Sequence, residues 1–282
     1  MEHFKSPFGP GDFVCARALE NQKFFGEMLE RARSHRFFSH PFMSTFESAP
    51  PSPELVSFVL TSFYKIVSPF TGLLCSLGGQ APNLRSRFAL MDNIFEEMGR
   101  GDLSLAHPSL YLKMLASIGV VADAAERTPT LLAIRRINDH LREVVEHRPF
   151  SVACAVLASA ESTIPPSFPV LATMARRAFA GIDMAFFDRH GPRDEGHSDD
   201  AALLFAVSAD SSHYSTVDSE VKIDLDYRSE LFDEWMEALT SAAPQPRFRV
   251  SDRPLRRVSE RPARPASVRP MGNHDSVPPA PR

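Results

Sequence analysis

The sequence predicts an all-α fold, a bundle of about eight helices joined by short connections. Up to about residue 242, apolar residues recur at the 3.6-residue period of a helix. No segment combines the period-two alternation and the hairpin turns that paired strands need. The chain has 282 residues, of which 43% are hydrophobic, so it can bury a substantial core. Together these observations favour a helical bundle over any sheet-containing architecture.

Helix signals mark the expected elements in order along the chain. Ser52, Pro53 and Glu54 form a typical helix opening, and the Gly78–Gly79 pair marks the end of that helix. Thr128 and Pro129 open a later helix in the same way. The segments with a helical pattern are 12–33, 52–79, 84–102, 107–120, 128–147, 150–163, 166–179, 186–200 and 218–242.

The charge distribution divides the chain into two parts. Residues 243–282 hold nine arginines, three acids and nine prolines, a charge of +6, which leaves −10 on residues 1–242 out of a total of −4. A segment of this composition cannot bury enough apolar area to offset its ordering entropy. We therefore expect an α-helical domain over 1–242 and a disordered Arg/Pro-rich tail over 243–282. The tail lacks the interleaved aromatics of a base-stacking surface, so nucleic acid is not the expected partner.

Cysteine usage and apolar runs indicate the compartment. Cys15, Cys75 and Cys154 are far apart and form no CxxC motif, so a disulfide framework is not expected. The first residues lack the apolar core of a signal peptide, and no run of eighteen uninterrupted apolar residues occurs. The sequence therefore predicts a cytoplasmic protein with no membrane partner.

The stretch FFDRHGPRDEGHSDD contains a pattern of potential metal ligands. His190, Asp194 and His197 are spaced at i, i+4 and i+7, which places them on one stripe of a helix. The same stretch contains two glycines and a proline, which make it a poor helix by propensity. A solvated helix face is the alternative interpretation of these three residues taken alone.

Glu161 is the only charged residue between Arg148 and Arg176, in a segment that is apolar on every side. Such a helix is expected to be buried. A buried carboxylate must be protonated, paired with a cationic side chain or bound to a metal ion. The sequence alone leaves these three states open.

Glu97 and His107 are separated by ten residues, which would be about 15 Å along one helix. That distance is too long for two ligands of one site. The intervening Gly-Arg-Gly-Asp sequence breaks the helix and allows the chain to fold back. The alternative is that Glu97 is a surface acid and His107 a helix cap.

Together these residues supply three carboxylates and three imidazoles. A mixed O/N donor set of six suits two adjacent iron or manganese ions with positions left open for O2 and substrate. Zinc is disfavoured because no cysteine joins the set. A ferritin-like site is disfavoured because the chain has no Glu-x-x-His pairs. The donors are Glu97, His107, Glu161, His190, Asp194 and His197.

The order of these residues resembles the haem-oxygenase-like diiron oxidases and oxygenases, whose pattern is Glu, His, Glu and then His-x3-Asp-x2-His. The resemblance covers Leu55 to Leu204. It implies a haem-oxygenase-like bundle in which the first two core helices supply Glu97, His107 and Glu161 and the third supplies the other three ligands. It also implies two Fe(II) ions, with manganese as an alternative, and O2 as cosubstrate. Since the third core helix of this family is poorly ordered without metal, we expect 188–199 to be irregular in a metal-free structure.

The resemblance predicts an O2-activating non-haem diiron oxidoreductase of natural-product biosynthesis. An amino-acid-like substrate is favoured over a fatty-acid-like one, with desaturation, C–H oxidation or C–C oxidation as the reaction. Nothing between Leu55 and Met91 is acidic, which argues against N-oxygenation, kept as an alternative.

Two functions of a different kind also stay open from the sequence. One is a metal-free enzyme that uses Cys75 or Cys154, and the other is a helical interaction module that acts through the basic tail. Lys65 is a candidate contact for a substrate carboxylate, or a surface lysine. A homodimer and an external electron donor are open as partners.

Overall fold

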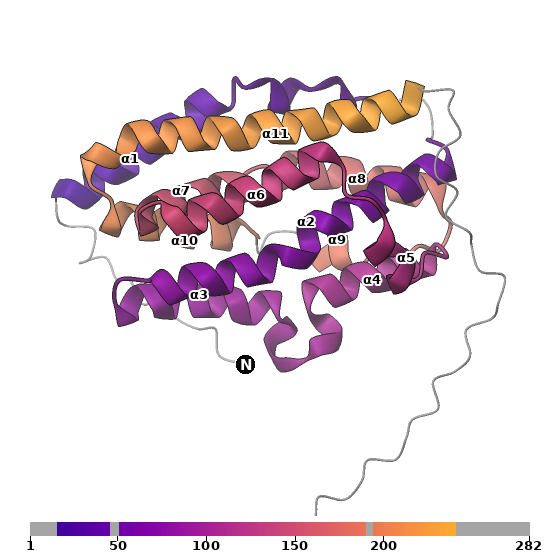
Figure 1. Cartoon of the computed structure of the whole chain (residues 1–282), viewed down its shortest axis with the longest axis horizontal. Helices are drawn as coiled ribbons and strands as arrows, with labels where there is room; N and C mark the ends of the chain where they lie inside the picture. The colour runs from indigo at the N-terminus through magenta and orange to yellow at the C-terminus, as the bar shows by residue number, and fades with distance from the viewer. Residues whose placement is uncertain (1–15, 46–50, 190–193, 241–282) are drawn as a thin grey trace, which may run out of the picture. The chain divides into compact units, whose positions relative to one another are not determined.

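The computed structural model describes residues 16–45, 51–189 and 194–240, which contain eleven α-helices and no strand (Figure 1). The all-α prediction is therefore confirmed for the described residues. The predicted disordered tail, 243–282, lies outside them. The α-helices are α1 Ala16–Ala32, α2 Pro53–Gln80, α3 Leu84–Glu97, α4 His107–Ser117, α5 Ala122–Arg127, α6 Leu132–His147, α7 Phe150–Glu161, α8 Ile164–Ala178, α9 Ala185–Arg189, α10 Asp194–Ser208 and α11 Tyr214–Thr240.

The predicted helices agree with the observed ones in place and order, with three differences. The sequence analysis missed α5, which is too short for apolar periodicity to stand out over six residues. It also missed most of α10, which continues to Ser208. Finally, the predicted segment 186–200 falls on two helices, α9 and α10, which together with α5 raises the number of described α-helices to eleven.

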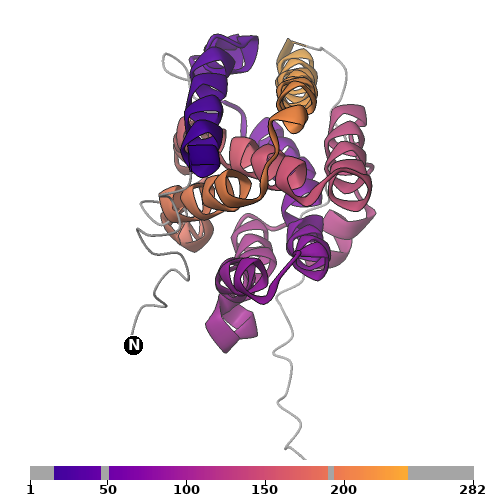
Figure 2. The same ribbon diagram turned by 90° about the vertical axis from the view of Figure 1, so that its left-hand side faces the viewer.

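Helix α7 is the centre of the bundle. Every residue from Ser151 to Glu161 is buried, because α6, α10 and α11 all pack against this helix. Both views place α11 on one side of the bundle and α3 with α4 on the opposite side (Figures 1 and 2). A residue of α7 that points away from α11 can therefore face α3 and α4.

Helices α7 and α10 are antiparallel. Ser151 at the start of α7 lies 2.9 Å (Oγ to Nδ1) from His213, which follows the end of α10. Glu161 is ten residues further along α7, about 15 Å away. Helix α10 ends at Ser208, and its first turns lie about the same distance before that residue. The start of α10 therefore lies at the Glu161 end of α7.

The long apolar helix α2 passes through the bundle. Among the described helices it alone is long and apolar enough to cross a membrane. Here it packs against α3, α4 and α6 instead, as the core helix of a helical bundle does. Pro69 inside α2 frees the carbonyl oxygen of Lys65, four residues earlier. The side chain of Asn138 on α6 donates to that oxygen at 2.8 Å, so α6 completes the hydrogen bonding of α2.

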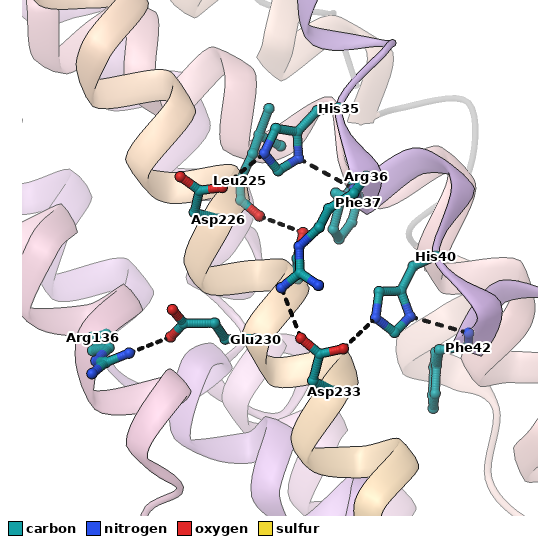
Figure 3. Close-up of polar contacts among 11 residues, drawn as sticks. His35, Arg36, Phe37, His40, Phe42, Arg136, Leu225, Asp226, Glu230 and Asp233 are labelled. Atoms are coloured by element: carbon teal, nitrogen blue, oxygen red, sulfur yellow. Dashed lines mark hydrogen bonds and ion pairs between the residues drawn. The ribbon is translucent and has the colours of Figure 1, made fainter.

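Residues 35–43, which we call the strap, run beside α11 as two short 3-10 turns (Figure 3). His35 and His40 each accept a backbone N–H at Nδ1, which caps the turn that follows. Because Nδ1 accepts, Nε2 must carry the proton. His35 Nε2 donates to Asp226 at 3.0 Å and His40 Nε2 to Asp233 at 2.9 Å. These bonds hold the strap on α11 and place Phe37 against the core, where it is 2% exposed.

Candidate metal centre

A cavity of about 100 Å³ lies inside the bundle, with walls from α2, α3, α4, α6, α7, α8, α9, α11 and the strap. Most of its lining is aliphatic or aromatic. The polar or charged residues of the lining are Glu97, His107, Glu161, Thr163, Ser167 and Arg228. An apolar pocket with a few convergent polar groups is the usual form of a small-molecule site.

Glu97 and His107 meet at this cavity. Glu97 is the last residue of α3 and His107 the first of α4, and both are 6% exposed. Glu97 Oε2 lies 2.8 Å from His107 Nδ1. The expected fold-back of the chain between them is observed, and it depends on Gly99. This residue has φ +76°, and a Cβ there would lie 2.5 Å from the backbone nitrogen of Ala106.

Glu161 lines the same cavity from the C-terminal end of α7 and is also 6% exposed. The prediction that its helix is buried is confirmed. Three of the six proposed ligands, Glu97, His107 and Glu161, therefore converge on one cavity from three helices, although Glu161 lies far from the other two in sequence.

The other three proposed ligands cannot be placed in the same way. His190 lies outside the described residues, and only the backbone is described for Asp194 and His197. Described residues near these three positions lie close to the cavity. Phe186 of α9 is a cavity-lining residue, four positions before 190. The first turns of α10, which hold positions 194 and 197, lie at the Glu161 end of α7, and α10 also contacts α3.

The segment 188–199, which we expect to be irregular without metal, falls on the end of α9 and the start of α10. Asp188 and Arg189 are helical in α9, and Asp194 to Asp199 are helical in α10. Positions 190–193, with the Gly191–Pro192 pair, lie outside the described residues. Burial of the later part of α10 against α7 explains why its first turns are helical despite Gly196, since packing outweighs propensity.

The donor types present fit iron or manganese. Two buried carboxylates and an imidazole line the cavity, and no cysteine does among the described residues. In the same part of the chain, no group of three or more His, Cys, Asp and Glu side chains is close enough to hold one ion. The described residues alone therefore do not complete a site, and the ligands proposed at 190, 194 and 197 would have to supply the rest.

The candidate cysteines do not suit a metal-free nucleophilic mechanism. Cys154 is fully buried in α7, and burial raises the pKa of its thiol well above the usual range. Its thiolate form is therefore negligible near neutral pH. Cys75 is exposed and does not line the cavity.

Arg228 is a cavity residue that the sequence analysis missed. A signal was available: Asp224 and Arg228 interrupt the apolar stripe of α11 four residues apart, at positions that should face the core. Lys65, considered earlier for a substrate carboxylate, lies elsewhere. Its Nζ donates to the backbone oxygen of Glu126 at 2.5 Å, and it does not line the cavity.

Fold and site together define a helical-bundle protein with buried acids and imidazole around a small apolar cavity. Residues 57–218, more than half of the chain, match the family described as iron-containing redox enzyme. The chain belongs to this family.

Among characterised proteins, the chain is similar to 4-chloro-allylglycine synthase from Streptantibioticus cattleyicolor. The two are 25% identical over 146 residues, which are 51% of this chain and 54% of the synthase. The similarity therefore spans about half the length of each protein.

Solved structures share the fold at low sequence identity. A CADD-like protein of unknown function from Nostoc punctiforme has a TM-score of 0.66 at 15% identity, over 79% of this chain and 100% of that one. A TenA homologue from Pseudomonas syringae has 0.63 at 16%, over 84% and 100%. A domain with a haem-oxygenase-like fold from Shewanella denitrificans has 0.60 at 15%, over 80% and 94%. The predicted haem-oxygenase-like fold is confirmed.

Proposed function

We propose that this protein is an O2-dependent non-haem diiron oxidase or oxygenase that acts on a small amino-acid-like substrate by desaturation, C–H oxidation or C–C oxidation. The observation that carries the proposal is the convergence of Glu97, His107 and Glu161 on one cavity in a chain of an iron-containing redox family. The similarity to 4-chloro-allylglycine synthase supports an amino-acid-like substrate.

Each part of the cavity has a function in this proposal. Glu97, His107 and Glu161, with His190, Asp194 and His197, would hold two iron ions. When bound, these ions supply the electrons that reduce O2. Glu97 and Glu161 bring negative charge to a buried site, which favours cation binding there. The aromatic walls, including Phe63, exclude water from the substrate.

Iron stoichiometry tests the proposal first. The protein would be loaded anaerobically with Fe(II), desalted, assayed for iron and mixed rapidly with oxygenated buffer. We expect two irons per chain and a transient visible absorption band. Glu161→Ala and His197→Ala should lose both. Glu220→Gln is the matched control, because Glu220 is equally buried but pairs with Arg148 away from the cavity.

The outcome also distinguishes this function from the alternatives, which are a helical interaction module and an N-oxygenase. A folded wild type with no stoichiometric iron and no reaction with O2 would contradict the proposal. Loss of activity on truncation after Ala242, without iron, would favour the helical interaction module that acts through the tail. Hydroxylamine or nitro products from amine substrates would favour N-oxygenation at the same site.

A further inference from the structure

The wall of the cavity on α11 carries a positive charge held in a fixed position. Arg228 is the only arginine or lysine among the described residues that line the cavity. Its side chain is 13% exposed, and its Nε donates to Asp224 Oδ2 at 2.6 Å. Asp224 lies one helical turn earlier on α11 and is fully buried. This ion pair fixes the plane of the guanidinium.

The pair with Asp224 uses only one edge of the guanidinium. The two Nη groups make no hydrogen bond to a described residue, and they form the edge that binds a carboxylate through two parallel N–H donors. We propose that Arg228, oriented by Asp224, binds the carboxylate of a small amino acid substrate. This proposal rests on the proposed function and adds the orientation of the substrate.

The orientation follows from the walls. Arg228 belongs to α11, whereas Glu97 and His107 belong to α3 and α4, on the opposite side of the bundle (Figures 1 and 2). The lining between these walls is mainly apolar, with Phe63 and Phe168 among its residues. A carboxylate on Arg228 would therefore direct an aliphatic side chain towards the acids. Oxidation would then occur on the side chain and not at the carboxyl carbon.

The local charge favours an amino acid over a simple carboxylic acid. Asp224 already neutralises Arg228, so the buried pair has no net charge. A carboxylic acid would add an uncompensated negative charge to this wall, which is costly in a low-dielectric site. An amino acid brings an ammonium group with its carboxylate and leaves the net charge unchanged.

Matched ligands test the proposal by fluorescence. Trp235 is the only tryptophan of the chain and is fully buried, with its ring 6.2 Å from Phe63 and 5.7 Å from Phe232, two lining residues. L-norleucine, L-norleucinamide and hexanoate would be titrated into anaerobic Fe(II)-loaded protein and into metal-free protein. We expect norleucine to bind at least about tenfold more tightly than norleucinamide, a difference of about 1.4 kcal/mol. Hexanoate should bind more weakly than norleucine.

Variants identify the residue responsible. Arg228→Gln should abolish the preference for norleucine over norleucinamide, and Arg228→Lys should keep part of it through a point charge. Arg136→Gln is the matched control, because Arg136 also pairs with an acid of α11, Glu230, but does not line the cavity (Figure 3). This control should keep the full preference. Thermal unfolding of each variant would show that it is folded.

Several results would overturn the proposal. Equal binding of norleucine and norleucinamide by the wild type would do so, as would a preference retained by folded Arg228→Gln or no binding of any of the three ligands. Hexanoate binding as tightly as norleucine would overturn the amino acid assignment. Iron measured on the same samples separates this inference from the diiron proposal. A wild type that discriminates the ligands without binding iron would keep the carboxylate site and remove the diiron centre.

Discussion

Glu161 and Asp224 are both buried acids beside one cavity, yet their surroundings differ. Asp224 is fully buried and has an arginine of its own helix at 2.6 Å. Glu161 is 6% exposed at the end of an apolar helix, and the only arginine or lysine among the described lining residues is Arg228 on α11. The α11 wall is thus neutralised within the chain, whereas the wall with Glu97 and Glu161 gathers acids. Under the proposed function, a cation from solution would bind at the second wall, and the carboxylate of an amino acid would bind at the first.

The largest expected effect comes from removing each acid in turn. Glu161→Gln should lower iron from two per chain to one or none and leave the metal-free protein folded. Asp224→Asn should keep two irons but lower the free energy of unfolding by about 3 kcal/mol, because it leaves Arg228 without its partner in a mostly buried position. Urea unfolding and an iron assay on the same samples check both. Full iron occupancy in Glu161→Gln would remove the distinction between the two walls.

Stabilisation by Fe(II) is a second test of the difference between the two walls. Fe(II) at about 100 times its dissociation constant should stabilise the wild type by about 2.7 kcal/mol for each bound ion, since it binds only the folded protein. The shift should shrink or disappear in Glu161→Gln and persist in full in Asp224→Asn. Anaerobic thermal unfolding with and without Fe(II) measures it, with Mg²⁺ as a control ion. Equal shifts in both variants would contradict a metal site at Glu161.

A smaller effect is expected at the turn that brings Glu97 to His107. Gly99→Ala should cost about 1–3 kcal/mol, because φ is +76° and a Cβ would meet the backbone of Ala106. It should also weaken iron binding by misplacing Glu97. Gly26→Ala is the control: Gly26 lies inside α1 with nothing within 4 Å of its Cβ position, so alanine should stabilise by about 0.5–1 kcal/mol. Normal iron binding by Gly99→Ala would mean that the turn does not position the ligand.

The smallest effect concerns the strap. Burial acts to raise the pKa of Asp233, but hydrogen bonds from Arg36 and His40 outweigh burial and lower it. A lowered folded pKa adds stability above the unfolded pKa of about 3.9, and this stability is lost as the pH falls through the folded value. Asp233 is about half exposed, so Asp233→Asn should cost less than about 1 kcal/mol.

The pH dependence provides the check on the strap. The difference in unfolding free energy between wild type and Asp233→Asn should be constant just above about pH 5, where the carboxyl is ionised in both the folded and unfolded states. It should then shrink at lower pH. A difference that grows below about pH 5 would mean that Asp233 does not stabilise the strap through its charge.

The sequence predicted those parts of the fold and site that depend on local signals. Periodicity located the long helices, and the Gly-Arg-Gly-Asp break predicted that Glu97 and His107 could meet. The isolation of Glu161 among apolar residues predicted its burial. Arg228 was missed although its position in the apolar stripe of α11 was visible, because the sequence does not show that this part of the stripe borders a cavity. The strap was missed because capping by His35 and His40 depends on side-chain tautomers and on acids about 190 residues away.

The hydrogen bond from Asn138 to Lys65 has a consequence for synthesis of the chain. Helix α2 ends at Gln80, while α6, which satisfies the carbonyl freed by Pro69, ends at His147, 67 residues later. At about 5–20 residues per second, roughly 3–13 s separate their emergence from the ribosome. During that interval the long apolar helix α2 lacks α6, its partner. A longer interval leaves α2 exposed for longer, so slow synthesis should favour aggregation, and co-expressed chaperones should raise the yield of folded protein.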